Sequence, residues 1–397
     1  MKSKWKRVSL GDLVELRNGV NFTQASQGQS IKVVGVGDFQ NWETLGDFET
    51  TGSVVINGDI QADDLLADND LLFVRSNGNK ALVGRCVILK NISEPITFSG
   101  FTIRARIKDS AIDPIFLSKI MRSELFQRHL HWFGSGSSIS NLSQDALSLL
   151  KFNLPPNAEQ QEIAAVLRTW DEAIDKLNSL IGMRAAEYGF HSRQFFSPCH
   201  PSFQGRDKGW KPFTLGQLFT ERTESGLDSD ALLSITMAEG VISQEDVGRR
   251  DSSTEDKSKY KLILPGDIGY NTMRMWQGVC GLSALRGIVS PAYTVVTPIQ
   301  SRIHARYALH LFKSKRMIHD FERYSQGLTS DTWNLKFPAF SEIKAFIPGP
   351  KIQIAQANYL DALKDEIEVL ERKAEALSRQ KRGLMQKLLT GEWRVKV

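Results

Sequence analysis

Cysteines and long apolar runs are both scarce in this sequence of 397 residues. Its three cysteines, Cys86, Cys199 and Cys280, are too few and too scattered for a disulfide framework or a zinc cluster, so we expect buried or idle thiols. No stretch approaches the roughly 18–20 uncharged apolar residues of a membrane-spanning helix, and the N-terminus has no apolar segment typical of a secretion signal. We therefore expect a cytoplasmic protein with no membrane partner.

Catalytic motifs are missing as well. The chain contains no Gly-x-x-x-x-Gly-Lys-Ser/Thr phosphate loop, no His-Glu-x-x-His pair and no Gly-x-Ser-x-Gly turn. Asn153-Leu154-Pro155-Pro156 differs from the Asn-Pro-Pro-aromatic motif of amino-methyltransferases, because a leucine separates the asparagine from the prolines. We interpret the two prolines as the start of a helix. The histidines form no ligand spacing with the cysteines. The sequence thus predicts no catalytic residue, metal site or cofactor in this chain.

The overall composition is that of a folded, mildly basic protein. Hydrophobic residues make up 41% of the chain and charged residues 24%, as is ordinary for globular proteins, and the length suits two or three domains. The formal net charge of +5 is compatible with a nucleic-acid partner but does not require one.

What the chain does contain is one pattern written twice. Leu154-Pro155-Pro156 and Ile347-Pro348-Gly349-Pro350 begin an ungapped register that runs on through two long helical segments, and Trp5 to Leu13 resembles Trp210 to Leu218. Shorter matches lie between these markers: Asp70-Leu71-Leu72-Phe73 with Pro265-Gly266-Asp267-Ile268-Gly269-Tyr270, Val83-Gly84 with Cys280-Gly281, Phe101-Thr102-Ile103 with Tyr293-Thr294-Val295, and Asn141-Leu142 with Asn334-Leu335.

Each copy is expected to be a strand-rich, mixed α/β domain. Apolar runs at 31–36, 70–74 and 101–105 are separated by Gly, Asn and Asp turn signals, as strands are. Asp113-Pro114 predicts the start of a helix over 114–132, and Ser143 predicts the cap of a second, short helix. We divide the chain into a first domain (1–153), a first long helix (154–197), a linker (198–209), a second domain (210–346), a second long helix (347–391) and a tail (392–397).

The two long helices, of about 40 residues and roughly 60 Å each, carry apolar residues at spacings of three and four. Such a seam is typical of a coiled coil, although two amphipathic helices that each pack on their own domain are an alternative. The predicted seam residues are Leu167, Trp170, Ile174, Leu177, Ile181, Leu360, Leu363, Ile367, Leu370 and Leu377.

Charge placement predicts how the helices pair. Both are acidic early, at 159–175 and 361–371, and basic late, at 184–193 and 379–387. Antiparallel pairing lays each acidic half against a basic half, so we expect it. Glu392 to Val395 weakly resembles Trp5 to Val8, which fits termini that meet and close a pseudo-twofold ring.

Two polar loops in each domain are the candidate binding surfaces. Arg pairs with guanine, and Asn or Gln with adenine, in the major groove of DNA, although solvated turn tips are an alternative for each residue. A predicted helix with seven basic residues between Arg306 and Arg323 either neutralises phosphates or solvates its outer face. The candidate loop residues are Arg75, Asn77, Asn79, Lys80, Ser135, Ser137, Ser138, Asn271, Arg274, Trp276, Gln277, Gln326, Thr329 and Ser330.

These features together resemble the specificity subunit of Type I restriction-modification enzymes. The resemblance rests on Trp-x-x-x-x-Leu-Gly at Trp5 and Trp210, on the strand from Asp70 to Arg75, on Asn141-Leu142-Ser143, and on the helix start from Leu154 to Ala164. It covers essentially the whole chain. The second copy departs from the pattern where Gly349 interrupts the prolines, Ile352-Gln353 replaces Glu-Gln, and Thr272 stands in place of Arg75.

The resemblance implies a fold and a division of labour. Two strand-rich target-recognition domains would each read one half of a bipartite, asymmetric site on double-stranded DNA. An antiparallel two-helix coiled coil would set the unread spacer and dock two modification subunits. Adenine-N6 methylation with S-adenosylmethionine, and ATP- and Mg-dependent cleavage, would belong to the modification and restriction subunits. Two alternatives stay open, namely a coiled-coil scaffold without a DNA role and a fused enzyme with its own catalytic site.

Overall fold

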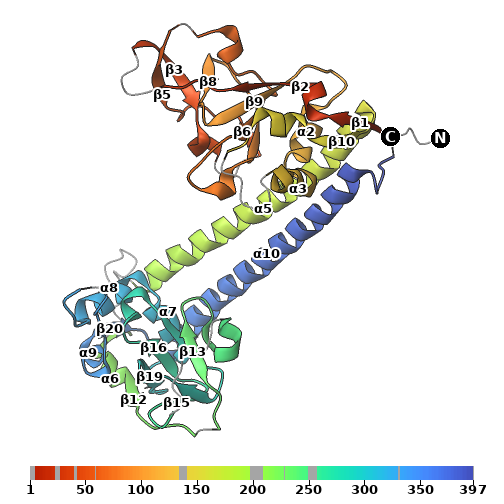
Figure 1. The fold of residues 1–397 in the computed structure, drawn as a ribbon. Helices are drawn as coiled ribbons and strands as arrows, with labels where there is room; N and C mark the ends of the chain where they lie inside the picture. Colours follow the sequence, from red (N-terminus) through yellow and green to blue (C-terminus); the bar gives the residue numbers. More distant parts are fainter. Residues whose placement is uncertain are drawn as a thin grey trace. The chain divides into compact units, whose positions relative to one another are not determined.

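The structure is a computed structural model that describes residues 5–22, 27–39, 43–58, 60–133, 141–196, 209–227, 229–248, 257–329 and 331–396. The chain forms two compact units, a first unit of residues 1–177 with 373–397 and a second unit of 178–372. Both boundaries fall inside long helices, α5 (Asn157–Phe196) and α10 (Pro350–Thr390) (Figure 1). Each unit is described by itself below.

The first unit is built on a five-stranded sheet whose two faces are both covered. Leu71 and Phe73 belong to the core on one face, and Leu72 and Val74 to the core on the other, because side chains alternate along a strand. The strand order is β2 (Val14–Asn18), β9 (Thr102–Ile107), β6 (Leu71–Val74), β7 (Cys86–Leu89) and β4 (Thr44–Leu45).

Short helices cover one face of this sheet. They are α1 (Leu10–Leu13), α2 (Pro114–Ile120), α3 (Glu124–Phe133) and α4 (Gln144–Ser148). Asp113 caps α2 by accepting from Phe116 N at 2.8 Å, and Ser143 caps α4 by accepting from Ala146 N at 3.0 Å, so both predicted helix starts are confirmed.

The predicted single helix over 114–132 is wrong, because the structure breaks it into α2 and α3. The break is made by Ser123, whose hydroxyl donates to Ile120 O at 2.6 Å and whose carbonyl then accepts from Gln127 N at 3.1 Å. A serine that bonds to the backbone of the preceding turn competes with continuation of the helix.

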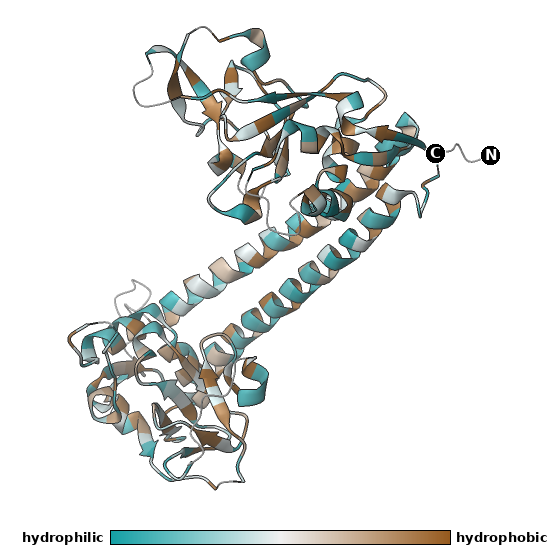
Figure 2. Ribbon diagram, in the orientation of Figure 1, coloured by the Kyte–Doolittle hydropathy of each residue, from teal (hydrophilic) through white to brown (hydrophobic). Residues whose placement is uncertain are grey.

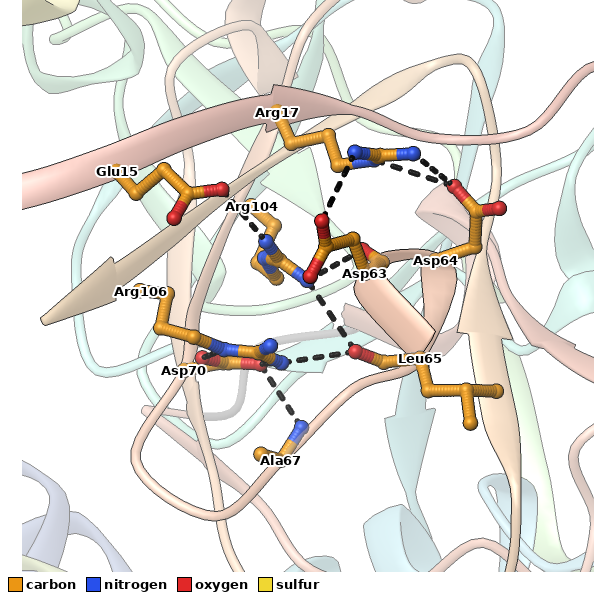
Figure 3. Close-up of polar contacts among 9 residues, drawn as sticks. All are labelled: Glu15, Arg17, Asp63, Asp64, Leu65, Ala67, Asp70, Arg104 and Arg106. Atoms are coloured by element: carbon orange, nitrogen blue, oxygen red, sulfur yellow. Dashed lines mark hydrogen bonds and ion pairs between the residues drawn. The ribbon is translucent and has the colours of Figure 1, made fainter. Parts of the chain in front are cut away.

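The opposite face of the sheet carries a second layer, in which a three-stranded sheet lies in the order β5 (Ser53–Asn57), β3 (Gly28–Val34), β8 (Ile96–Phe98). An arginine cluster ties the segment 63–70, which follows β5, to β2 and β9 (Figure 3). Arg106 Nη2 lies 2.7 Å from an Asp70 carboxylate oxygen, and the fully buried Arg104 donates to Asp63 O at 2.6 Å. Arg17 reaches Asp64 at 2.7 Å.

The second unit repeats the central sheet and the helical layer. Its four strands run in the corresponding order, and their helix-facing side chains form one apolar core. The strands are β12 (Phe219–Arg222), β19 (Tyr293–Pro298), β16 (Ile268–Asn271) and β17 (Cys280–Leu282), and the helices are α6 (Leu215–Leu218), α7 (Ala305–Phe312), α8 (Lys315–Tyr324) and α9 (Phe337–Glu342).

Strand register aligns the two units residue by residue. Leu71 faces Ile88 and Ala105, and Ile268 faces Leu282 and Val296 in the same pattern. The tandem repeat is therefore confirmed, but two of the matches made in sequence were out of register. Cys86 corresponds to Cys280, Gly84 (φ +82°) to Gly278 (φ +80°), and Thr102 to Tyr293. Loops of different length hide such shifts until backbone pairing fixes them.

The second layer differs in the second unit. A hairpin of β13 (Leu233–Thr236) and β14 (Gly240–Ser243) and the pair β15 (Lys261–Ile263) with β18 (Gly287–Val289) cover the sheet. A Cβ at Gly281 would lie 2.6 Å from Gly240 Cα, so backbone packs directly on backbone there. The apolar cluster of this layer includes Leu233, Ile263 and Val295.

A short strand pair connects each domain to its long helix. β1 (Lys6–Ser9) pairs with β10 (Lys151–Leu154), after which α5 begins, and β11 (Lys211–Thr214) pairs with β20 (Lys344–Ile347), after which α10 begins. In the first unit the tail lies against the N-terminal strand, because Arg394 pairs with Glu159 and its guanidinium lies 5.2 Å from the Trp5 ring. The expected meeting of the two ends is therefore confirmed for residues 5 and 394.

Parts of both long helices contribute to each unit's core. The first core includes Leu167 of α5 together with Leu388 and Leu389 of α10, and the second includes Leu360 of α10 together with Phe196 of α5. Figure 2 shows hydrophobic residues gathered in the strands and helical layers, with mostly hydrophilic residues along the visible side of α10. Both long helices are thus parts of the folded domains as well as connections.

The helices run antiparallel within each unit, as the charge pattern predicts. Asp171 of α5 pairs with Lys381 of α10 in the first unit, where Glu159 pairs with Arg394. In the second unit Arg184 lies 3.0 Å from Glu366. Of the predicted seam residues, Leu167, Leu360 and Leu363 are buried and the others are partly buried, and their pairing as a coiled-coil seam stays a prediction.

Candidate functional site

The loop after β16 holds four of the predicted binding residues in a fixed turn. Asn271 Oδ1 accepts from Met273 N at 3.0 Å, and Trp276 Nε1 donates to Met273 O at 3.0 Å. These bonds leave the exposed Arg274 side chain at the outer edge of the loop, with Nη1 3.5 Å from Gln277 Oε1. The turn therefore presents a guanidinium and an amide side by side.

A second loop lies against the first in the same unit. Leu335 N donates to Thr272 O at 2.8 Å, and the Trp333 ring packs edge-on against Trp276 with centroids 5.2 Å apart. Gln326 pairs with Asn334 through backbone hydrogen bonds, and Thr329 is exposed on the same loop. The predicted residue Ser330 lies outside the described residues. The structure thus joins the two loops that the sequence could only name separately.

A hollow of about 190 Å³ opens at this junction. Arg274, Asn271 and Trp276 line it from the first loop, and Asp331 lines it from the second. Met273 and Ala292 also line it and add apolar surface. Cationic, amide and apolar groups are the types that contact guanine, adenine and the thymine methyl group in a DNA major groove.

The corresponding loop of the first unit follows β6. Arg75 Nη1 donates to Gly100 O at 3.3 Å, and Asn77 Oδ1 accepts from Asn79 N at 2.8 Å. Asn79 in turn caps a 3-10 turn by accepting from Ala81 N, next to the exposed Lys80. The asparagines are therefore partly committed to shaping the loop, because each side-chain oxygen already serves the backbone.

The second loop of the first unit falls mostly outside the described residues, which applies to the predicted Ser135, Ser137 and Ser138. Its end is described, since Asn141 bridges to Ser76 and Leu142 N donates to Arg75 O at 2.8 Å. This is the same connection that Leu335 makes to Thr272, so the two loop pairs are equivalent.

One residue beside this site was not selected from the sequence. Phe101 is 63% exposed, and its carbonyl accepts from the backbone N–H groups of Arg75 and Ser76. It was assigned to a strand, but β9 begins only at Thr102. An exposed aromatic side chain beside an arginine suits stacking or apolar contact with a base. Its signal in the sequence was a phenylalanine between Gly100 and Thr102, at the edge of a predicted strand.

The predicted basic helix does not exist as one surface. The structure divides it into α7 and α8, and Arg306 and His310 both contact Asp361, with His310 buried and Arg306 still partly open to solvent. Lys313 is partly buried and donates to Met237 O at 3.2 Å. On α8, the exposed Lys315, Arg316 and His319 border a cavity of about 460 Å³ that Arg193, Phe190 and Phe196 also line.

The two described cysteines are buried, as expected. Burial raises the pKa of the Cys86 thiol far above its usual range and that of Cys280 to about 12, so both stay protonated and unreactive. Among the described residues no group of three or more His, Cys, Asp and Glu side chains is arranged to hold a metal ion. The helices of the described part include none that is long and apolar enough to cross a membrane.

Known proteins share this arrangement. Residues 2–181 match the family described as Type I restriction modification DNA specificity domain. The chain is 23% identical over 257 residues to the specificity subunit of the Type I restriction enzyme EcoKI from Escherichia coli strain K12, over 60% of this chain and only 55% of that subunit. It is 23% identical over 365 residues to the MjaVIII specificity subunit from Methanocaldococcus jannaschii, over 84% of this chain and 81% of that protein.

A solved structure has the same fold along nearly its whole length. The Type I restriction-modification S subunit from M. genitalium superposes with a TM-score of 0.56 over 97% of this chain and 96% of that one, at 15% identity. The family match covers the first domain and most of the first long helix, and the superposition shows that the fold is shared along the chain. Over residues 2–181 the chain is thus similar to the DNA specificity domain of Type I restriction enzymes, and the relatives that it matches are specificity subunits of such enzymes.

Proposed function

We propose that this chain selects the DNA target of a Type I restriction-modification complex, with each unit reading one half of a bipartite site. The observation that carries this proposal is the equivalence of the two loop pairs. Leu142 N bonds to Arg75 O in the first unit as Leu335 N bonds to Thr272 O in the second, yet the side chains presented around these bonds differ. One scaffold with two different polar edges suits a site with two different halves.

Catalysis belongs to other subunits in this proposal. Two modification subunits with S-adenosylmethionine would methylate adenine N6, and restriction subunits with ATP and Mg would translocate and cleave. The chain itself contributes recognition and docking and acts in the cytoplasm, where chromosomal DNA is reached. The helix pair would set the unread spacer, since α5 and α10 each contribute 40 or 41 residues that connect the two cores.

The direct test is the methylation pattern of the assembled complex. We expect the chain reconstituted with its modification subunits to methylate a bipartite, asymmetric motif, detected by sequencing modified bases on random DNA. Methylation with no sequence preference would overturn the proposal. Specific methylation by the chain alone would favour a fused enzyme, and the absence of salt-sensitive DNA binding by the complex would favour a scaffold.

Arg274 gives a sharper test of the candidate site. Arg274→Ala should weaken discrimination at one half-site by about 10- to 100-fold, because a bidentate contact to a base contributes roughly 1–3 kcal/mol. The other half-site should keep its preference. Arg372→Ala, at an exposed arginine on α10, is the matched control and should leave both preferences unchanged. Loss of discrimination at both half-sites together would show that Arg274 supports the fold and does not read a base.

A further inference from the structure

The second helix of each domain contacts the long-helix pair through one buried polar side chain. In the first unit this residue is Lys119 of α2, of which 7% of the side chain is exposed. Its ammonium group forms ion pairs with Glu43 and, at 2.7 Å, with Asp171 of α5. Lys381 of α10 pairs with the same two carboxylates, at 3.3 Å from Glu43. Arg122 Nε completes the cluster at 3.3 Å from Glu43.

The second unit has a different residue at the equivalent place. His310 lies six residues after the N-cap of α7, as Lys119 lies six residues after the N-cap of α2. Its Nε2 lies 2.7 Å from Asp361 of α10, and its Nδ1 lies 3.0 Å from the Tyr188 hydroxyl of α5. Arg306 holds the other Asp361 oxygen at 2.9 Å. His310 therefore contacts both long helices directly, whereas Lys119 contacts α5 and shares its two carboxylate partners with Lys381 of α10.

A second connection fixes the same helices at their N-termini. The fully buried Gln160, in the first turn of α5, donates to Ala111 O and accepts from Asp113 N at 2.7 Å. The fully buried Gln353, in the first turn of α10, donates to Arg302 O and accepts from His304 N at 2.8 Å. Asp113 and His304 are the N-caps of α2 and α7. Two points of attachment leave each domain one orientation on its helix.

The glutamine connection joins a domain to its own helix, whereas the ion-pair cluster around Lys119 and the contacts of His310 include residues of both helices. Asp171 and Lys381 meet at Lys119 only in one register of α5 against α10. Tyr188 and Asp361 meet at His310 under the same condition. A slip of one helix would separate these partners and leave charged or polar groups buried without them, which is costly. These contacts therefore form only when α5 and α10 are paired in this register.

We propose that Lys119 and His310 are positioning residues that lock the register of the helix pair and thereby set the distance between the two DNA half-sites. This inference rests on the proposed function. One helical turn is about 5.4 Å, and one base pair lengthens a duplex by about 3.4 Å. A domain displaced by one turn would therefore meet a half-site moved by roughly one to two base pairs.

The test measures spacer preference and not overall activity. The complex of the full chain with its modification subunits is assayed for methylation on DNA that carries the native half-sites with the native spacer or with one base pair added or removed. Lys119→Met should lower the preference for the native spacer roughly tenfold, which corresponds to about 1.4 kcal/mol, with both half-site sequences unchanged. Lys119→Arg, which keeps the charge, should restore most of that preference.

A merely structural role predicts something else. If Lys119→Met lowers methylation of every spacer by the same factor, or leaves the spacer preference intact, the inference is wrong. His310→Gln is an independent variant in the other unit and should loosen the spacer in the same way if Lys119→Met does not fold. An unaltered complex that recognises no bipartite site would overturn the proposed function as well, whereas a spacer preference insensitive to both variants would overturn only this inference.

Discussion

The two units share one face of their central sheet and differ on the other. Behind both sheets, helices begin and end at corresponding positions, and equivalent cysteines, Cys86 and Cys280, lie buried against them. On the other face, the first unit carries a three-stranded sheet and the arginine cluster of Figure 3, and the second carries a hairpin and a second strand pair. The helical face packs against the long helices in both units, whereas the opposite face differs between them.

One aspartate shows how such divergence is compensated. Asp70 and Asp267 occupy equivalent positions and are both buried. Arg106 pairs with Asp70, but Thr297 stands at the position of Arg106 in the second unit, so Arg222 of the neighbouring strand supplies the guanidinium at 2.7 Å. Both units keep the carboxylate, but the arginine that pairs with it comes from a different strand in each. The buried charge therefore needs a partner, and that partner can come from either neighbouring strand.

The largest expected effect comes from removing that carboxylate. Asp70→Ala should destabilise the first unit by about 3–5 kcal/mol, because it leaves the Arg106 guanidinium without its partner in a largely buried site. Hydrogen exchange of β6 and β9 measures the change locally. Asp267→Ala should destabilise β16 and β19 in the same way, since Arg222 then keeps only the exposed Glu224 as a charged partner. Unequal losses in the two units would show that the compensation is incomplete.

The second-largest loss of stability is expected when one residue is exchanged between the units. Gly281 and Val87 are equivalent, and a side chain at Gly281 meets the Gly240 backbone while Val87 is fully buried. Gly281→Val should push the β13–β14 hairpin off the sheet, at a cost of about 1–3 kcal/mol or more. Val87→Gly should cost about as much through the cavity it leaves. Faster hydrogen exchange in each layer is the measurement, and an unchanged hairpin would contradict the close packing.

Acid should affect the second unit before the first. Burial lowers the pKa of His310 below 6.5 despite the nearby Asp361 carboxylate, with Lys364, Lys313, Arg306 and Tyr188 also facing it. The unfolded chain therefore binds a proton first, and stability from this site falls as the pH drops below 6.5. Although burial alone would raise it, the pKa of Glu43 is lowered to about 2 by Lys119, Lys381 and Arg122, so its contribution persists down to pH 4.5 and is lost toward pH 2.

Matched variants separate these two pH responses. His310→Gln should remove the loss of second-unit stability that begins as the pH drops below 6.5, and Glu43→Gln should flatten the response of the first unit between pH 4.5 and 2. Chemical denaturation followed by hydrogen exchange in α7 and α2 at each pH distinguishes the units. If both units lose stability over the same pH range, the assignment to these residues fails.

The smallest expected effect concerns a helix cap. Ser143 accepts from Ala146 N at the start of α4, whereas α9 begins after Lys336, whose ammonium group cannot accept a hydrogen bond. Ser143→Ala should cost about 1 kcal/mol, and Lys336→Ser should stabilise α9 by a similar or smaller amount. Thermal unfolding of the two variants gives the comparison. A stabilising Ser143→Ala would contradict the capping role.

Several features could be predicted from the sequence because they depend on local chemistry or on periodicity. Asp113-Pro114 and Ser143 gave two helix starts, and the change from acidic to basic residues along both helices gave their antiparallel pairing. The single helix over 114–132 was wrong because the serine that ends α2 resembles any other helical serine in sequence. The prediction of one basic helix over 306–323 was wrong. The spacing of the basic residues gives no information about Asp361, which lies on another helix and pairs with Arg306 and His310.

The candidate site was named in sequence but assembled only by the fold. Arg274 and Trp276 stood out as polar and aromatic residues after a strand, yet their contact with Trp333, and the hollow shared with Asp331, join segments far apart in the chain. Phe101 was missed because only its exposure makes it a candidate for base contact, and a phenylalanine beside a strand is ordinarily buried.

The sequence by itself determined the repeat, the class of fold, the long helices and their direction, since these follow from periodicity, capping and charge order along the chain. Only the tertiary structure decided which residues of the two copies are equivalent and which polar groups share a site. Gln160 with Asp113, and Lys119 with Asp171 and Lys381, are contacts between distant segments that backbone register creates. Local propensity cannot specify such pairs, because their stability comes from burial and from partners that the chain brings together on folding.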